Sequence, residues 1–335
     1  MKLFDTLKIK DMVLKNRIVM PPMCMYSALD GMANDFHVIH YATRAMGQMG
    51  LIILESTAVM DNGQITNKDL GLWKDEQIKP LSWIVNRVKA FDAKVGIQLG
   101  HAGRRAQDTN NRVSASELAF GNFETPKALT IDEIKAVIQS FKAAAKRAYI
   151  AGFDFIEIHA AHGYLISSFL SPLSNTRTDM YGGSQQNRAR LLYEIIDAVR
   201  EEWPLEKPLG IRISYHDYHK DGLQAENFVE ILNGIKPGLV DVINVSTGGI
   251  LQVKVDDYPG YQLPGAKKLK HNTEFTILAG GLIYDATLAN DIIQDQDADL
   301  IYFGRLSLRD PYFPLRFAKQ LQADIKWPVQ YERAK

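Results

Sequence analysis

Residues 132–159 read DEIKAVIQSFKAAAKRAYIAGFDFIEIH and contain one helix followed by one strand. The first part has helical periodicity, with Thr130 ahead of it as an N-cap and Gly152 at its end. The second part, FDFIEIH, is a short apolar run of the kind that forms a strand buried on both faces. This stretch therefore predicts a helix that leads directly into a strand of a parallel sheet.

Seven further runs rich in Val, Ile and Leu recur along the chain, each without clean alternation. They are NRIVMPPM (16–23), GLIILES (50–56), KVGIQLG (94–100), PLGIRIS (208–214), LVDVINVS (239–246), FTILAGG (275–281) and DLIYFGR (299–305). Helical patterns lie between them, among them 185–203, 225–235 and 285–295. Eight strands alternating with helices predict an α/β fold, a (β/α)8 TIM barrel that forms a single domain over 1–335. A doubly wound open sheet is the alternative, although no glycine-rich dinucleotide fingerprint follows the first strand.

Composition excludes several classes of protein. Of the 335 residues, 46% are hydrophobic and 23% are charged, with Lys+Arg and Asp+Glu equal at 39 each, so no nucleic-acid surface is expected. No apolar run approaches the roughly 18–20 residues of a membrane span, and the start MKLFDTLKIK shows no signal peptide. Cys24 is the single cysteine, so no intrachain disulfide can form and a reducing, cytoplasmic setting is expected.

Polar and reactive residues gather where the predicted strands end. In a barrel, the loops at the carboxyl ends of the strands build the active site. These residues are Met23, Cys24, Met25 and Tyr26 after the first strand, Ser56 after the second, Gln98 to Arg105 around the third, His159 to Tyr164 after the fourth, Arg212 on the fifth, Gly280 and Gly281 on the seventh, and Gly304 and Arg305 on the eighth. A packed barrel core does not explain such a ring.

The histidines His159 and His162 allow three interpretations. Metal binding is disfavoured because the spacing is three residues and the one nearby carboxylate, Glu157, is expected to point away from its neighbours on the strand. They can also be structural, or they can direct two N–H donors at one substrate oxygen. In the last case Tyr164 is placed to act as a proton donor.

Other candidates are weaker when taken singly. Free cysteines such as Cys24 are usually small buried hydrophobes, and Tyr26 belongs either to the core or to a substrate contact. The glycine pair and the Gly304-Arg305 pair in the last two loops together predict a phosphate-bearing cofactor. A buried Arg212 needs a core carboxylate or an electron-rich cofactor ring. His101, Arg104 and Arg105 either support the site or lie on its rim, and 174–184 is assigned to architecture.

Eight sequence blocks occur in one order along essentially the whole chain. They are LKNRIVMPPMCMYS (14–27), GLIILEST (50–57), GIQLGHAGR (96–104), IHAAHGYLISSFLSPLSNTRTDMYGGS (158–184), IRIS (211–214), LAGG (278–281), YFGRLSLRDP (302–311) and PVQYER (328–333). Together they resemble the Old Yellow Enzyme family of flavin-dependent ene reductases, most closely its thermophilic-like NADPH dehydrogenase class.

The resemblance implies a barrel that binds FMN. Gln98 would bond the pyrimidine edge, Arg212 would lie near N1 and the C2 carbonyl, and Cys24 would tune the flavin potential. Arg305 would hold the phosphate with the backbone of the neighbouring glycines. The residues that would contact FMN are Pro21, Pro22, Met23, Cys24, Ser56, Gln98, Arg212, Gly280, Gly281, Gly304 and Arg305. Ser56 departs from the alanine that relatives often have there.

The resemblance also implies a reaction. NADPH or NADH would reduce the flavin, and hydride would pass to the β-carbon of an α,β-unsaturated carbonyl compound in ping-pong fashion. His159 and His162 would grip the carbonyl oxygen, Tyr164 would protonate the α-carbon, and Tyr26 would contact the substrate. Arg333, in a tail of about 322–335, would reach the active site of a neighbouring subunit in a homo-oligomer, a dimer or tetramer. A metal-dependent barrel hydrolase and a non-catalytic flavin-binding redox sensor are the alternatives.

Overall fold

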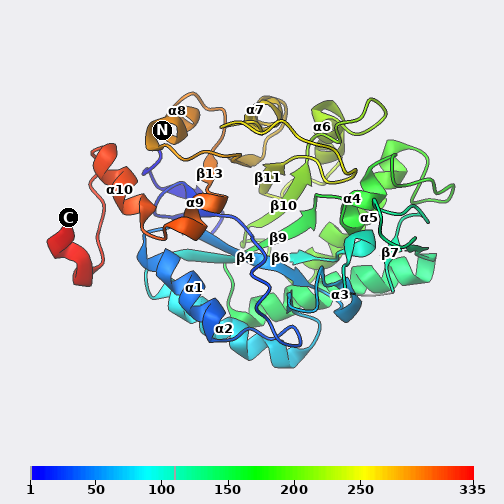
Figure 1. Ribbon diagram of the computed structural model, residues 1–335, viewed down its shortest axis with the longest axis horizontal. Coiled ribbons are helices and arrows are strands. Elements are labelled where there is room, and N and C mark those ends of the chain that lie inside the picture. Colours follow the sequence, from blue (N-terminus) through cyan, green and yellow to red (C-terminus); the bar gives the residue numbers. More distant parts are fainter. Residues whose placement is uncertain (1, 109–110) are drawn as a thin grey trace.

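Eight parallel strands close into a barrel in the computed structural model, which describes residues 2–108 and 111–335 (Figure 1). Each strand pairs with the next, and β3 pairs with both β4 and β13 to close the ring. The strands are β3 (Ile18–Met20), β4 (Leu51–Ala58), β6 (Lys94–Gly100), β9 (Phe155–Ala160), β10 (Leu209–Ser214), β11 (Val242–Ser246), β12 (Thr276–Ala279) and β13 (Leu300–Tyr302). The predicted (β/α)8 barrel is confirmed, and the open sheet is wrong.

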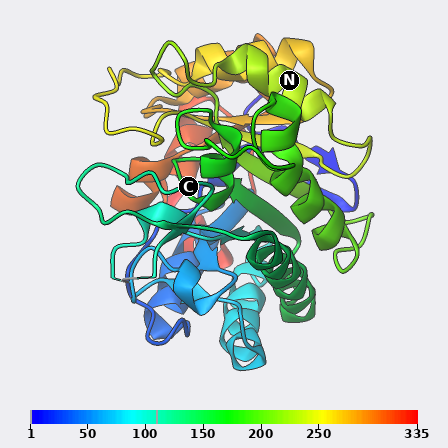
Figure 2. The same ribbon diagram turned by 90° about the vertical axis from the view of Figure 1, so that its right-hand side faces the viewer.

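Helices surround the strands on the outside of the barrel (Figure 2). The longest are α1 (Asp35–Met46), α2 (Ile78–Lys89), α3 (Ile131–Ala151), α5 (Gln185–Arg200), α6 (Ala225–Asn233), α7 (Leu263–Asn272), α8 (Ala286–Gln294) and α10 (Phe313–Gln320). The predicted caps of α3 are present: the Thr130 side chain accepts the Glu133 N–H, and Gly152 has a left-handed φ of 90°. Within the described chain, no helix is both long and apolar enough to cross a membrane.

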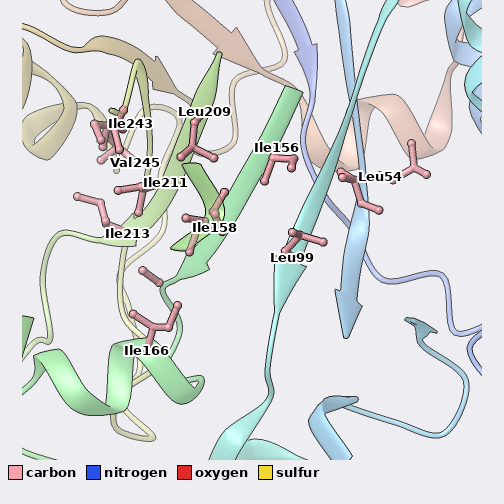
Figure 3. Close-up of a cluster of buried hydrophobic side chains, with 14 of the residues drawn as sticks. Leu54, Leu99, Ile156, Ile158, Ile166, Leu209, Ile211, Ile213, Ile243 and Val245 are labelled. Carbon is pink, nitrogen blue, oxygen red and sulfur yellow. The ribbon is translucent and has the colours of Figure 1, made fainter. Parts of the chain in front are cut away.

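Apolar side chains that point outward from the strands pack against the helices. Figure 3 shows part of this layer, in which Leu54 on β4, Leu99 on β6 and Ile158 on β9 belong to one buried cluster. Ile211 and Ile213 on β10 continue it. Because side chains alternate across a strand, the residues between these positions face the inside of the barrel.

A small hairpin closes the amino-terminal end of the barrel. It consists of β1 (Leu7–Ile9) and β2 (Met12–Leu14), and its Ile9, Met12 and Leu14 belong to one buried cluster with inward-facing side chains of the barrel strands. Phe155 fills the interior above it. A Cβ atom on Gly210 would lie 2.4 Å from the Phe155 ring, so glycine is needed there. This end of the barrel is therefore packed with hydrocarbon.

Towards the carboxyl ends, the inward-facing residues become polar. The strand ends read Gln98-Leu99-Gly100, Glu157-Ile158-His159, Arg212-Ile213-Ser214 and Asn244-Val245-Ser246. The first and third positions carry the polar side chains, except that glycine takes the third position at residue 100. The expectation that these strands lack clean alternation is therefore wrong at their carboxyl ends. The alternation places two stacked polar layers at this mouth of the barrel.

Short elements lie in the connections around this mouth and at the chain end. They are η1 (Asp61–Gly63), β5 (Leu70–Gly71), η2 (Asp75–Gln77), η3 (Gly103–Arg105), β7 (Val113–Ser114), β8 (Lys127–Ala128), α4 (Leu165–Leu170), α9 (Gly304–Arg309) and η4 (Val329–Ala334). The chain ends in η4, at the edge of the molecule beyond α10 (Figure 1).

Candidate active site

A cavity of about 280 Å³ opens at the carboxyl ends of the strands. Five of the residues selected from the sequence line it, namely His162, Arg212, Gly281, Gly304 and Arg305. The other lining residues are Ser246, Thr247, Tyr261, Gln262, Leu282, Ile283, Tyr284 and Tyr302. The four loops that follow β9, β11, β12 and β13 thus meet where the fold places barrel active sites.

Two guanidinium groups make this cavity electropositive. Among the described residues, no carboxylate lies within ion-pair distance of Arg212 or Arg305, and the buried Nε of Arg212 has no hydrogen-bond partner. Arg212 donates a long hydrogen bond of 3.4 Å to the carbonyl of Pro22 and lies 5.7 Å from the centre of the Tyr302 ring. Of the two partners predicted for Arg212, the core carboxylate makes no direct ion pair, although Glu157 is close enough for the charge of Arg212 to lower its pKa. The cavity favours an anionic or electron-rich ligand.

Glu157 lies in the middle of the barrel, a role that sequence reasoning missed. It is completely buried and accepts hydrogen bonds from Gln98 Nε2 at 2.8 Å and Asn244 Nδ2 at 2.7 Å. Burial raises the pKa of Glu157, while the charge of Arg212 and these two hydrogen bonds lower it. Glu157 points to the opposite side of the strand from its neighbours Ile156 and Ile158, as expected, but this is the inner face that it shares with His159, two residues further on.

The two histidines meet, as the sequence predicted. His159 Nε2 and His162 Nδ1 are 3.4 Å apart, and the rings are nearly perpendicular. His159 Nδ1 accepts the Ala161 N–H at 3.2 Å, which places the proton of this imidazole on Nε2. His162 has a left-handed φ of 60°, and its N–H donates to Ser214 Oγ. This strained backbone turns the second imidazole towards the first.

A chain of hydrogen bonds starts at His162 Nε2, on the side of the ring away from His159, and was not predicted from the sequence. Ser246 Oγ lies 2.7 Å from His162 Nε2 and accepts a hydrogen bond of 3.3 Å from Gln262 Nε2. Gln262 Oε1 in turn accepts the Tyr302 hydroxyl. Since Ser246 receives a proton donor from Gln262, its own O–H is available to His162 Nε2. That arrangement leaves the His162 proton on Nδ1, facing His159.

Tyr164 and Cys24 lie beside the histidines. The Tyr164 ring centre is 4.8 Å from that of His159, and the Arg105 guanidinium lies 5.2 Å from the Tyr164 ring. Tyr164 and Cys24 both pack against a small apolar cluster of Ile65, Ala102 and Ala106. Burial raises the pKa of the Tyr164 phenol and of the Cys24 thiol, so both keep their protons at neutral pH. Burial likewise lowers the pKa of both histidines well below the ordinary value, so both are neutral.

The remaining predicted residues surround this centre in different ways. Ser56 lies near His159, because a Cβ atom on Gly100 would be 3.1 Å from Ser56 Oγ and 3.3 Å from His159 Cβ. A Cβ atom on Gly304 would make ordinary contacts with Met23 and Pro21.

The glycine pair is required by packing and by backbone conformation. A Cβ atom on Gly280 would lie 2.2 Å from the Tyr302 ring, and Gly281 has a φ of 99° that glycine adopts without strain.

Three residues at the edge of the site have distinct positions. Tyr26 has a left-handed φ of 51° and is half exposed. Arg105 donates to the carbonyl of His162, which makes it a support of the site and not a loose rim residue. Arg333 is exposed in η4 and is not among the residues that line the cavity.

Comparisons with known proteins agree with this geometry. The model of the NADH:flavin oxidoreductase / NADH oxidase family matches residues 2–324. The NADPH dehydrogenase of Clostridium acetobutylicum is 49% identical over 338 residues, which cover 100% of this chain and 99% of that protein. The NADPH dehydrogenase of Bacillus subtilis is 48% identical over 335 residues, covering 99% of this chain and 98% of that one. A solved structure of morphinone reductase in complex with tetrahydroNAD superimposes with a TM-score of 0.84 at 28% identity, covering 98% of this chain and 93% of that one.

Proposed function

The chain belongs to the NADH:flavin oxidoreductase / NADH oxidase family, and we propose that it is an FMN-dependent ene reductase. Membership confirms the resemblance to Old Yellow Enzymes, and the enzyme is a flavin oxidoreductase that uses NADPH or NADH. Bound FMN would accept hydride from the reduced nicotinamide and deliver it to the β-carbon of an α,β-unsaturated ketone or aldehyde. The observation that carries the proposal is the pair of imidazole donors beside a phenol at the mouth of an electropositive cavity.

The residues present fit FMN. Arg212 and Arg305 provide positive charge, and no carboxylate of the described residues forms an ion pair with either, as a phosphate and an electron-rich ring require. Glu157 engages the amide nitrogen of Gln98, which leaves the amide oxygen as an acceptor for the pyrimidine N–H. We propose that FMN is held by Pro21, Pro22, Met23, Cys24, Ser56, Gln98, Arg212, Gly280, Gly281, Gly304 and Arg305.

The two imidazoles would bind the substrate carbonyl. Each is neutral, and the partners described above leave one proton on His159 Nε2 and one on His162 Nδ1. Two N–H donors only 3.4 Å apart are better satisfied by an oxygen that accepts from both than by each other. Such an oxygen gains two hydrogen bonds as negative charge develops on it, which withdraws electron density from the β-carbon.

Tyr164 would supply the proton. Hydride addition at the β-carbon leaves an electron pair at the α-carbon, and a buried phenol that keeps its proton at neutral pH is a suitable acid for it. The Arg105 guanidinium beside the ring lowers the pKa of Tyr164, which opposes the effect of burial and stabilises the phenolate formed. Solvent then returns the proton to the phenolate.

The decisive experiment separates cofactor binding from turnover. The purified protein is expected to show flavin absorption that NADPH removes under anaerobic conditions and 2-cyclohexenone restores. A His159→Ala/His162→Ala double variant should keep its FMN and lose enone reduction, and unchanged turnover would contradict the assignment. Flavin that NADPH does not bleach would favour the redox-sensor alternative.

A metal-dependent hydrolase finds no support in the side-chain arrangement. Over residues 2–108 and 111–335, no three His, Cys, Asp or Glu side chains are grouped to hold a metal ion. Metal analysis of a colourless preparation that FMN does not reconstitute would reopen that alternative.

We also propose that Arg333 completes the active site of a neighbouring subunit in a homo-oligomer, a dimer or tetramer. Support comes from its position, because Arg333 is exposed in η4 at the edge of the molecule. Removing the last five residues should weaken substrate binding and oligomerisation together, and no change in either would dismiss the role. The tail from about residue 322 and a cytoplasmic setting likewise stay predictions.

A further inference from the structure

Glu55 is a buried carboxylate that the chemistry proposed above does not use. It lies between β4 and α1, outside the barrel, and its side chain has no exposed surface. Oε2 accepts the backbone N–H of Met25 at 2.8 Å, and Oε1 accepts the Tyr41 hydroxyl at 3.0 Å. In the part of the chain that the structure describes, His37 is the one basic group within ion-pair distance. A carboxylate buried without a permanent cation is costly, so its retention indicates a role.

The backbone of Glu55 forms a β-bulge. The register of β4 against β6 passes from Leu54 opposite Ile97 to Ser56 opposite Gln98, and Glu55 is skipped. Side chains take over its backbone hydrogen bonds: the N–H donates to the Tyr41 hydroxyl at 3.1 Å, and the carbonyl accepts from Thr57 Oγ1 at 2.9 Å. Tyr41 therefore contacts both the backbone and the carboxylate of the bulged residue and fixes it in place.

The bulge decides which side chains face the site. Leu51 and Ile53 belong to the cluster inside the barrel, whereas Leu54 belongs to the outer one. Strict alternation would continue with Glu55 inside and Ser56 outside. The extra residue reverses this order, so that Glu55 reaches α1 and Ser56 reaches the inner mouth beside His159.

Glu55 also holds the loop that follows the first barrel strand. Its carboxylate accepts the N–H of Met25 at 2.8 Å, and the nearby backbone of Ser56 lowers the pKa of the Cys24 thiol, which burial raises. The next residue, Tyr26, has the left-handed φ that places its ring at the edge of the site. The bulged residue of β4 thus anchors the middle of this loop through the Met25 N–H.

His37 adds a polar contact whose strength depends on the charge of Glu55. Its Nδ1 lies 3.2 Å from the Asn34 N–H and 3.1 Å from Asn34 Oδ1. Its Nε2, which has no hydrogen-bond partner among the described residues, lies 3.6 Å from Glu55 Oε1. Burial raises the pKa of Glu55 to about 7, and the hydrogen bonds from Met25 and Tyr41 oppose that rise while the charge of Asp69 adds to it. Burial lowers the pKa of His37 to about 4, so the imidazole stays neutral while Glu55 titrates.

We propose that Glu55 is a positioning residue whose carboxylate, held by Tyr41, fixes the Cys24–Tyr26 loop and the inward turn of Ser56 for substrate binding. The proposal rests on the proposed ene-reductase function, and it assigns Glu55 no contact with substrate or FMN. When the carboxylate is protonated, its hydrogen bond to the Met25 N–H weakens and the loop loses its fixed position.

The test compares Glu55→Gln and Tyr41→Phe with Glu194→Gln as a matched control. Glu194 also accepts a tyrosine hydroxyl, that of Tyr181 at 2.7 Å, but on α5 and away from the loop. For holoenzymes, KM and kcat for 2-cyclohexenone are measured across the pKa of about 7, together with the absorption spectrum and reduction potential of bound FMN. Wild-type KM should rise as pH falls through that value. Glu55→Gln should show a KM raised about tenfold and independent of pH, because it loses a charge-assisted hydrogen bond, with kcat nearly unchanged.

The outcomes separate this proposal from the general function. A Glu55→Gln enzyme with wild-type KM and a wild-type pH profile would overturn it, as would an equal effect of Glu194→Gln. If Glu55→Gln does not fold, Tyr41→Phe must show the same raised KM. If wild-type protein binds FMN but reduces no enone, the proposed ene-reductase function is contradicted. The role of Glu55 is then tested by the absorption spectrum of bound FMN at different pH values. A pH step in the flavin spectrum that Glu55→Gln abolishes would then support the role of Glu55, and an unaltered step would overturn it.

Discussion

The Glu157 carboxylate accepts a hydrogen bond of 2.8 Å from the Nε2 of Gln98 at the centre of the barrel. The two residues lie on the neighbouring strands β6 and β9, and their contact orients an amide that would otherwise be free to turn by 180°. A second hydrogen bond, from Asn244, fixes the carboxylate itself. The amide proposed to recognise the flavin edge is thus positioned by a residue that need not touch the flavin.

Glu157→Gln should weaken FMN binding. A glutamine in this place can donate or accept, so the Gln98 amide loses its single orientation, and the dissociation constant should rise roughly tenfold. The substitution should also shift the flavin potential, because it alters the polar group beside Arg212. Titration with FMN and a potential measurement would check both. A Glu157→Gln protein with wild-type affinity and potential would show that Gln98 is oriented by other groups.

Ser246→Ala should weaken the hydrogen bonds that His159 and His162 are proposed to donate to the substrate carbonyl oxygen. Without the hydroxyl, His162 Nε2 has no proton donor, and the tautomer with the proton on Nδ1 loses its support. With FMN saturating, kcat/KM for the enone should fall about tenfold. Ser246→Thr retains the hydroxyl and should restore most of the activity. Equal activity of the alanine and threonine variants would argue against this role of Ser246.

Tyr164→Phe should slow one half-reaction only. Flavin reduction by NADPH does not use the phenol and should keep its rate. Reoxidation by 2-cyclohexenone should slow roughly hundredfold, because the α-carbon loses its positioned acid. Stopped-flow absorption resolves the two steps, and the exposed Tyr149→Phe serves as a control. Slowing of both steps to the same extent would point to a disturbed site and not to a lost proton.

Glu55→Gln should change how stability depends on pH. The pKa of Glu55 is raised from 4.5 to about 7, so in this window folded wild-type protein keeps a proton that the unfolded chain releases. Wild type should therefore lose stability as pH rises through the window, by up to on the order of 3 kcal/mol, and the variant should not. Below about pH 4.5, wild type and Glu55→Gln should have the same free energy of unfolding.

Urea unfolding at several pH values measures this difference. The pKa of His37 is lowered to about 4 and that of His40 to about 3, so both imidazoles destabilise the fold at low pH. They are present in both proteins and cancel in the comparison. A difference in unfolding free energy that stays constant with pH would mean that Glu55 does not titrate in the folded state.

The barrel could be predicted because its apolar signal is repeated. Eight runs of Val, Ile and Leu mark strands buried on both faces, and the caps Thr130 and Gly152 mark the longest helix. The hairpin β1–β2 was not predicted, since three-residue strands are too short for a periodic pattern. The helix α1 was missed as well, because buried histidines interrupt its apolar face.

The site was predicted where single residues are chemically distinctive and missed where geometry matters. His159, His162 and Arg212 stand out in an apolar context, and the structure brings them together. A pattern of polar residues at every second position does indicate which strand residues face the inside of the barrel. It applies to Glu157, Asn244 and Ser246, which were not predicted. The bulge at Glu55 had none, because alternation within β4 gives no indication that one residue is extra.

The hairpin that closes the amino-terminal end of the barrel limits the routes by which substrates can enter. Ile9, Met12 and Leu14 pack into the interior, so molecules reach the inner layers from the carboxyl-terminal mouth alone. In the proposed reaction, the reduced nicotinamide and the enone would both enter through this mouth and would occupy the site in turn. At high concentration, each of the two substrates should therefore act as a competitive inhibitor of the other.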